Sequence, residues 1–377
     1  MIYLDNNATT PLDEEVKSAI RRALDIFGNP SSSHIPGREA HDLIEQSRMS
    51  VAGLIGAEPD EILFTSGGTE SNNLAIIGHV LTHGRGHIIS SAIEHPSVGN
   101  PLRKLESLGY EVTYIKPGGN GIIEPEEIKR NLRQDTVLVT VMHANNETGT
   151  IQPIEEISSF LNERGITFHT DAAQSVGKID VDVRNLGTDL LTIVPHKFYG
   201  PKGTGALYVR GSTVLNPVLY GAGQEHGLRP GTENIIGIAG LGRACERASQ
   251  EFSTTEEHNT PRLAEILFRM LSESIPDIRL NGHNSPRLPN TLNISIKGIK
   301  GCELVESLKN SVAISSGSAC HSGTSTPSKV LLSMGIRPEE ALSSVRVSTG
   351  RFNTGEEIGK ASGLIAEAVG KLRPGIT

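Results

Sequence analysis

Apolar residues in the first two thirds of the chain occur in short runs that are separated by longer segments of mixed character. The short runs are rich in β-branched and aliphatic residues, and each one predicts a β-strand. They lie at 61–65, 87–90, 111–115, 136–142, 166–170, 190–194 and 205–209. The segments before and between them predict helices at 38–55, 96–108, 124–133 and 153–164. Strands that alternate with helices favour a mainly parallel sheet with helices on both faces.

The pattern changes after about residue 255. From there the chain predicts helices at 258–274, 303–309, 338–343 and 355–371, with strands at 290–296 and 344–348. The first ten residues have the character of a short extended arm. We therefore expect an α/β fold with two domains: a large one over 15–255, and a smaller α+β domain formed by 1–14 and 256–377.

The composition is typical of a soluble globular protein, with 36% hydrophobic and 21% charged residues in a chain of 377. A net charge of -8 gives no support to direct binding of nucleic acid or of an anionic membrane. No apolar run approaches membrane-spanning length, and we expect no signal peptide. The three cysteines, Cys245, Cys302 and Cys320, lack C-x-x-C spacing, which argues against a disulfide framework and favours a cytoplasmic location.

A single lysine follows the strand at 190–194. Lys197 lies beside His196, and Gly200 and Pro201 come shortly after it. This layout predicts an amine at the mouth of a sheet, where desolvation makes it a better nucleophile for carbonyls. The carbonyl that we expect is the aldehyde of pyridoxal 5'-phosphate (PLP), held as a Schiff base. Taken alone, the segment also fits a solvated surface lysine.

Small residues follow the strand at 61–65. Gly67, Gly68 and Thr69 lie where that strand ends and a helix begins. Their backbone N–H groups can approach an anion closely, and the helix N-terminus adds positive potential. This predicts a phosphate cradle, although the segment matches neither common nucleotide-binding motif and also fits a plain β–α turn.

Two polar residues follow the strand at 166–170. Asp171 can pair with a protonated pyridine nitrogen, which keeps the ring able to accept electrons from a substrate. Gln174 can donate a hydrogen bond to the ring oxygen of the same cofactor. Asp171 also fits the N-cap of a following helix, and this local role alone would explain an aspartate at this position.

A histidine follows the strand at 87–90 on the same predicted edge of the sheet. The His95 imidazole can stack on a planar cofactor and move protons. A lone histidine is more often structural. The functional role is favoured here because His95 follows a strand on the same edge of the sheet as the other candidate residues.

Two residues of the C-terminal part fit roles in substrate chemistry. Cys320 lies among the small and polar residues of 315–327, which suits an exposed thiol nucleophile that must move. Arg346 lies in the alternating strand at 344–348, where its guanidinium can clamp an α-carboxylate. The alternatives are an incidental loop thiol and a surface arginine.

Three histidines are spaced by four residues: His79, His83 and His87. Histidines at this spacing on a helix can bind zinc. Gly84 and Gly86 break the helix between them, and no acid completes an H-E-x-x-H pattern. We interpret these residues as a solvated helix end and expect no metal.

In combination and in order, these motifs resemble the class V, fold-type I PLP enzymes, in particular the NifS-like cysteine desulfurases and selenocysteine lyases. The resemblance runs from 3–11 to 346–352. It implies the PLP-dependent transferase fold and a homodimer. It also implies that the cofactor is held by Gly68, Thr69, His95, Asn146, Asp171, Gln174, His196, Lys197 and, from the neighbouring subunit, Thr232.

The resemblance also implies the reaction. Lys197, His95 and Cys320 match the catalytic residues, and Asn146 and Arg346 match those that hold the substrate carboxylate. We expect an L-cysteine desulfurase that leaves L-alanine and a persulfide on Cys320, with the sulfur passed to an acceptor such as an iron–sulfur scaffold. An aminotransferase would give Cys320 no role, and a non-catalytic protein of the same fold would bind no yellow cofactor.

The chain departs from many desulfurases just before the lysine. Val194 stands where those enzymes place a phosphate-binding serine, and Pro195 follows it. This predicts the loss of one hydrogen bond to the phosphate. The segments 191–201 and 319–322 are more similar to selenocysteine lyases, so L-selenocysteine stays open as the alternative substrate.

Overall fold

The structure is a computed structural model that describes residues 1–253, 259–317, 319–321 and 324–373, with side chains for 1–251, 263–317 and 326–373. Its larger sheet has seven strands within these residues, in the order β2-β8-β7-β6-β5-β3-β4. The strands are β2 (Ile62–Thr65), β3 (His87–Ser91), β4 (Glu111–Ile115), β5 (Thr136–Thr140), β6 (Thr167–Asp171), β7 (Leu190–Ile193) and β8 (Gly205–Val209). All pairings among β3 to β7 are parallel, and β8 runs antiparallel to both of its neighbours.

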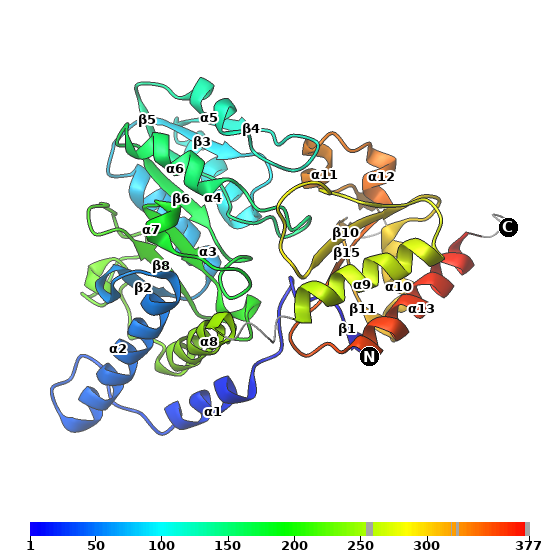
Figure 1. The fold of residues 1–377 in the computed structure, drawn as a ribbon. Coiled ribbons are helices and arrows are strands. Elements are labelled where there is room, and N and C mark those ends of the chain that lie inside the picture. Colours follow the sequence, from blue (N-terminus) through cyan, green and yellow to red (C-terminus); the bar gives the residue numbers. More distant parts are fainter. Residues whose placement is uncertain (254–258, 318, 322–323, 374–377) are drawn as a thin grey trace.

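Helices cover this sheet on both faces (Figure 1). They are α1 (Glu14–Ala23), α2 (Ile35–Ile55), α3 (Gly68–Asn73), α4 (Pro96–Ser107), α5 (Pro125–Asn131), α6 (Ile154–Asn162), α7 (Val183–Leu186) and α8 (Ile235–Ser253). Capping residues determine where several of these helices begin or end. Asp13 caps α1 by accepting from Glu15 N, and α2 ends at Gly56 in the left-handed conformation that suits glycine.

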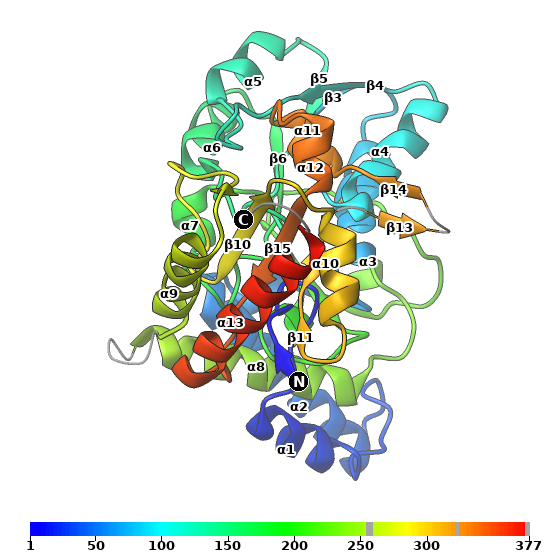
Figure 2. The same ribbon diagram turned by 90° about the vertical axis from the view of Figure 1, so that its right-hand side faces the viewer.

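A second, four-stranded sheet has the order β12-β15-β10-β9 in the described chain. Its strands are β9 (Ile278–Leu280), β10 (Thr291–Ile296), β12 (Ser315–Ser316) and β15 (Ser344–Ser348). The helices α9 (Asn259–Ser274), α10 (Gly301–Leu308) and α13 (Gly355–Leu372) lie on its outer face, away from the large sheet (Figures 1 and 2). The short helices α11 (Lys329–Ser333) and α12 (Pro338–Leu342) complete this part.

The N-terminal arm belongs to this second body. Strand β1 (Ile2–Tyr3) pairs in parallel with β11 (Val312–Ala313), and Ile2 and Leu4 pack into the apolar cluster beneath the smaller sheet. A separate and larger apolar cluster lies against the seven-stranded sheet. The exact domain boundaries at 14 and 255 stay a prediction.

Most predicted elements are found within two residues of their expected ends, and the mainly parallel sheet is confirmed. The sequence did not reveal α8, the antiparallel direction of β8, or the hairpin of β13 (Ala319–His321) and β14 (Thr324–Thr326). No helix in the described part of the chain is long and apolar enough to cross a membrane.

A buried ion pair fastens a loop to the edge of the large sheet. Arg48 of α2 donates to both carboxylate oxygens of Glu225, at 3.0 and 2.7 Å, and the side chains are only 8% and 2% exposed. Glu225 also accepts the backbone N–H of Phe64 in β2. Glu225 and His226 both have positive φ, which costs free energy in residues other than glycine. The ion pair therefore holds 225–226 in a backbone conformation that would otherwise be unfavourable.

We predict that Glu225→Gln lowers the free energy of unfolding by about 3 kcal/mol, because Arg48 would keep a buried charge without its counter-ion. The measurement is the midpoint of urea denaturation, followed by far-UV circular dichroism. Glu367→Gln is the matched control, since Glu367 pairs with Lys371 at the surface and such pairs contribute at most about 1 kcal/mol. Equal midpoints for the two variants would contradict the role of the buried pair.

Candidate functional site

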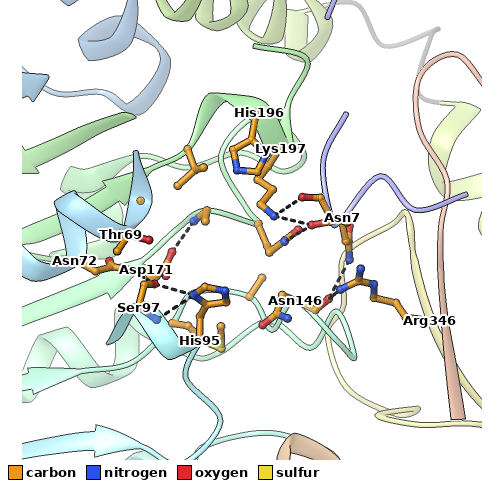
Figure 3. A pocket seen from close by; sticks show the side chains of 17 residues that line it. Asn7, Thr69, Asn72, His95, Ser97, Asn146, Asp171, His196, Lys197 and Arg346 are labelled. Atoms are coloured by element: carbon orange, nitrogen blue, oxygen red, sulfur yellow. Dashed lines mark hydrogen bonds between the residues drawn. The ribbon is translucent and has the colours of Figure 1, made fainter. Parts of the chain in front are cut away.

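The carboxyl ends of the parallel strands surround a pocket of about 430 Å³. Asp171 ends β6, Lys197 follows β7, and His95 follows β3, so the sheet brings together residues that are far apart in the chain. Figure 3 shows them around one cavity. The lining residues are Asn7, Ala8, Gly68, Thr69, Asn72, His95, Ser97, Met142, Ala144, Asn146, Asp171, Ala173, Gln174, Val194, His196, Lys197 and Arg346.

Lys197 points its amine into this pocket toward the N-terminal arm. Its Nζ donates to the carbonyl oxygens of Asn7 and Ala8, at 2.9 and 2.8 Å. Desolvation, followed by the nearby Arg346 guanidinium, lowers the pKa of Lys197 to about 8. A substantial fraction of this amine is therefore unprotonated near neutral pH, which a nucleophile or a base requires.

Asp171 lies at the floor of the pocket, where neighbouring side chains fix it. Its Oδ2 accepts from Asn72 Nδ2 at 2.9 Å, and its Oδ1 accepts from Ala173 N at 3.0 Å. Asn72 is oriented in turn by Thr192, whose hydroxyl donates to Asn72 Oδ1. Asp171 is not the N-cap of a following helix, because residues 173–178 form turns; its carboxylate makes one local turn contact and lines the pocket.

The two histidines of the site favour the neutral form, because each is partly desolvated. His95 Nδ1 lies 2.7 Å from the hydroxyl of Ser97, and burial lowers the pKa of His95. His196 Nδ1 lies 3.2 Å from the hydroxyl of Thr9, and burial followed by the charge of Lys197 lowers the pKa of His196 to about 4. Neutral imidazoles can stack on a ring and accept a proton.

The first turn of α3 forms one end of the pocket. Gly67 has a φ of +146°, which favours glycine, and Gly68 begins the helix. The first backbone N–H groups of a helix lack intrahelical acceptors, so they are available to an anion. A Cβ built on Gly68 would lie 2.6 Å from Val194 Cγ2. Val194 thus occupies the space that a larger residue at 68 would need, and it offers this end of the pocket methyl groups only.

Arg346 reaches the opposite end of the pocket from β15. Its Nη2 forms an ion pair with Asp5 Oδ1 at 2.7 Å, and its Nη1 donates to Asn146 O at 3.0 Å. Its buried Nε has no hydrogen-bond partner among the described residues. The guanidinium places a positive charge at this end of the pocket, where a carboxylate can bind.

The pocket brings together ten residues that the sequence analysis singled out. They are Gly68, Thr69, His95, Asn146, Asp171, Gln174, Val194, His196, Lys197 and Arg346. Thr232 is exposed and does not line the pocket of its own subunit. The side chain of Cys320 lies outside the described residues, although its backbone is in β13. The role of each of these residues stays a prediction.

Sequence reasoning missed three polar residues at the site. Asn7 accepts from Lys197 through its backbone oxygen, Asn72 positions Asp171, and Lys178 donates to the side chains of Asn7 and Gln174. The run of polar residues after the first strand was the one available signal for Asn7. Lys178 gave none, because an isolated lysine in a turn-rich segment is usually exposed.

The interpretation of the three spaced histidines as a solvated helix end is wrong for two of them. His79 is buried and its ring lies between the carbonyl oxygens of Val214 and Val137, each at 3.2 Å. His87 is fully buried in β3 between two threonine hydroxyls. No group of three or more His, Cys, Asp or Glu side chains in the described chain is arranged to hold a metal ion.

Comparisons with known proteins agree with this geometry. Residues 2–360 match the model of the family described as "Aminotransferase class-V". The chain belongs to the class-V aminotransferase family. It is 46% identical to "Cysteine desulfurase IscS" of Dictyoglomus turgidum, over 99% of this chain and 95% of the relative.

Solved structures of this class-V fold are also similar. A "NIFS-LIKE PROTEIN" superposes with a TM-score of 0.91 at 34% identity, covering 98% of this chain and 99% of its own. The structure described as "SspA in complex with cysteine" has a TM-score of 0.83 at 38% identity, covering 94% of this chain and 100% of its own. The fold expected from the sequence, with its large mainly parallel sheet, is therefore confirmed.

Class-V aminotransferases depend on PLP as a family, and the pocket has the chemistry to hold this group. A lysine amine of lowered pKa, a buried carboxylate, and a glycine-lined helix start lie on different sides of one cavity. These groups are complementary to an aldehyde, a pyridine nitrogen and a phosphate, respectively.

We predict that reductive methylation of Lys197, in protein freed of cofactor, rises with pH around a midpoint near 8, because only the unprotonated amine reacts. An ordinary lysine has a pKa of about 10.4. The measurement is peptide mass spectrometry after short pulses of reagent at a series of pH values. Arg346→Gln should move the midpoint upward, since it removes a neighbouring positive charge. A wild-type midpoint near that of an ordinary lysine would contradict the buried environment of the amine.

Proposed function

We propose that this protein is a PLP-dependent L-cysteine desulfurase. One observation carries the proposal: the desolvated Lys197 amine shares a pocket with Asp171 and Arg346, in a chain 46% identical to a protein named cysteine desulfurase. A structural relative in the same family is described in complex with cysteine, which supports this amino acid as the substrate.

The proposed cofactor site uses residues from every side of the pocket. Lys197 would join the aldehyde carbon, Asp171 would pair with the pyridine nitrogen, and Gly68 and Thr69 would hold the phosphate. His95 would stack on the ring, and Gln174, His196 and Asn146 would add polar contacts at its edge. When bound, PLP supplies an electron sink for the bonds at the substrate Cα and Cβ.

The protein would orient the substrate by its carboxylate. The Arg346 guanidinium and Asn146 lie side by side in the lining of the pocket, where they would bind the carboxylate. This contact would place the substrate Cα near the Lys197 amine. Once released from the cofactor, Lys197 would remove the Cα proton, and its pKa of about 8 suits a group that gives and takes protons near neutral pH.

Cys320 would accept the sulfur. Its thiolate attacks the substrate Sγ, so that a new S–S bond forms and the Cβ–Sγ bond breaks. The electron pair of the broken bond stays with Cβ, which takes a proton and becomes a methyl group. Lys197 would then return a proton to Cα, which completes L-alanine. Because a thiol is a poor nucleophile, the reaction requires the deprotonated form of Cys320.

The segment 219–236 supports the homodimer. Tyr220 is 85% exposed and Leu219 is 48% exposed, so this segment presents apolar surface, and Thr232 lies on it outside its own pocket. We propose that Thr232 reaches the cofactor phosphate of the neighbouring subunit. We further propose a cytoplasmic enzyme that passes its sulfur to an acceptor protein such as an iron–sulfur scaffold.

The deciding experiment measures alanine together with sulfide or selenide from L-cysteine and from L-selenocysteine. We expect a yellow protein that releases alanine from L-cysteine, and both properties should be lost in Lys197→Ala. Cys320→Ala should keep the yellow colour and lose the reaction with cysteine.

Three outcomes would change the assignment. A Lys197→Ala protein that still turned over would exclude the proposed mechanism. Activity confined to L-selenocysteine, and retained in Cys320→Ala, would favour a selenocysteine lyase. Amino transfer to a keto acid without release of sulfide would favour an aminotransferase.

We predict that Gly68→Ala weakens PLP binding roughly tenfold, because the new methyl group would collide with Val194. Val194→Ser should restore the affinity of the Gly68→Ala protein, since it removes the crowding and adds a hydroxyl beside the phosphate. The measurement is equilibrium titration of cofactor-free protein with PLP. Gly53→Ala is the control, because a methyl group there meets nothing within 4 Å. Additive effects of the two substitutions would refute the coupling.

A further inference from the structure

A second lysine is partly buried behind the pocket. Lys178 follows the turn after β6, and its Nζ donates to Gln174 Oε1 at 2.6 Å and to Asn7 Oδ1 at 2.9 Å. It forms no ion pair with a carboxylate among the described residues. Most lysines keep their amine in water, because removing an ammonium group from water is costly without a partner of opposite charge. The reaction described above does not use this residue.

The charges around Lys178 are of its own sign. Burial lowers the pKa of Lys178 well below its ordinary value, and the positive charges of Lys197 and of Arg346 on β15 lower it further. Asp171 and Asp5 favour the charged form of Lys197. The surroundings of Lys178 therefore favour its neutral amine, which still donates hydrogen bonds.

The contacts of Lys178 fix the direction of two amide groups. A lysine amine donates hydrogen bonds, so the atom that faces it in each amide is the oxygen. The nitrogen of Gln174 is then directed away from Lys178, and it donates to Asn7 O at 3.0 Å. Asn7 Nδ2 is directed toward Thr291 Oγ1, at 2.8 Å. Without Lys178, either amide could rotate and present its oxygen instead.

We propose that Lys178 is a positioning residue for the cofactor: it holds Gln174 with its N–H group toward the ring oxygen of PLP. This inference rests on the proposed function. A hydrogen bond donated to the ring oxygen disfavours a proton on the nitrogen that joins Lys197 to the cofactor, so Lys178 acts on the pKa of that nitrogen through Gln174.

The test is a pH titration of the visible absorbance of the bound cofactor in wild-type protein and in Lys178→Met. We expect the midpoint to rise by roughly one pH unit in the variant. Lys178→Arg should return the midpoint toward the wild-type value, since it keeps a donor for the side-chain oxygen of Gln174. If Lys178→Met does not fold, Lys178→Ala replaces it, because it also removes the donor; a raised midpoint is expected there also.

Asn290→Ala is the matched control. Asn290 Nδ2 donates to the same oxygen of Asn7, at 3.2 Å, but among the described residues it forms no hydrogen bond with Gln174. We expect this variant to lose thermal stability without a change in the midpoint. An unchanged midpoint in the Lys178 variants, or equal shifts in Lys178→Met and Asn290→Ala, would overturn the proposal. Wild-type protein that binds no PLP would instead refute the proposed function, so the two failures are distinguishable.

Discussion

Hydrogen bonds between Lys197 and the N-terminal arm determine where the reactive amine lies. Lys197 Nζ donates to the carbonyl oxygens of Asn7 and Ala8, while the side chain of Asn6 and the backbone of Asn7 bond to Ser348 at 2.9 Å. The arm therefore joins the end of β7 in the large sheet to β15 in the small one. Because neutral carbonyl groups replace water around the amine without supplying a counter-charge, burial can lower its pKa and prepare it for chemistry.

The balance of charge in the pocket follows from the same arrangement. Lys197, Lys178 and Arg346 place hydrogen-bond donors around the arm, whereas Asp171 lies on the floor and Asp5 is already paired with Arg346. Such an excess of donors favours a ligand that brings negative charge of its own. A phosphorylated cofactor and the carboxylate of an amino acid both meet this requirement, and each would find donors at a different end of the cavity.

The sequence predicted the elements well where a strong local pattern existed. The strands of the large sheet are short apolar runs, and their ends carry Asp171, His95 and Lys197 because parallel strands present their carboxyl ends at one edge. Helix α8 was missed because Gly237, Gly240 and other weak helix formers interrupt its pattern. The structure gives the reason for one of them: a Cβ at Gly240 would lie 3.0 Å from Ile20 of α1, so glycine permits close packing of the two helices.

The sequence by itself determined the alternation of strands and helices and the order of the polar residues at strand ends, since both depend on local periodicity and composition. It could not determine that Asn72 holds Asp171 or that the arm reaches Lys197, because these contacts join residues 99 and 190 positions apart. It also could not determine that Lys178 is partly buried, because that depends on which segments cover the turn. Only the tertiary structure decides burial and partner, and for a lysine these two properties separate a solvated surface charge from a group that can act in a reaction.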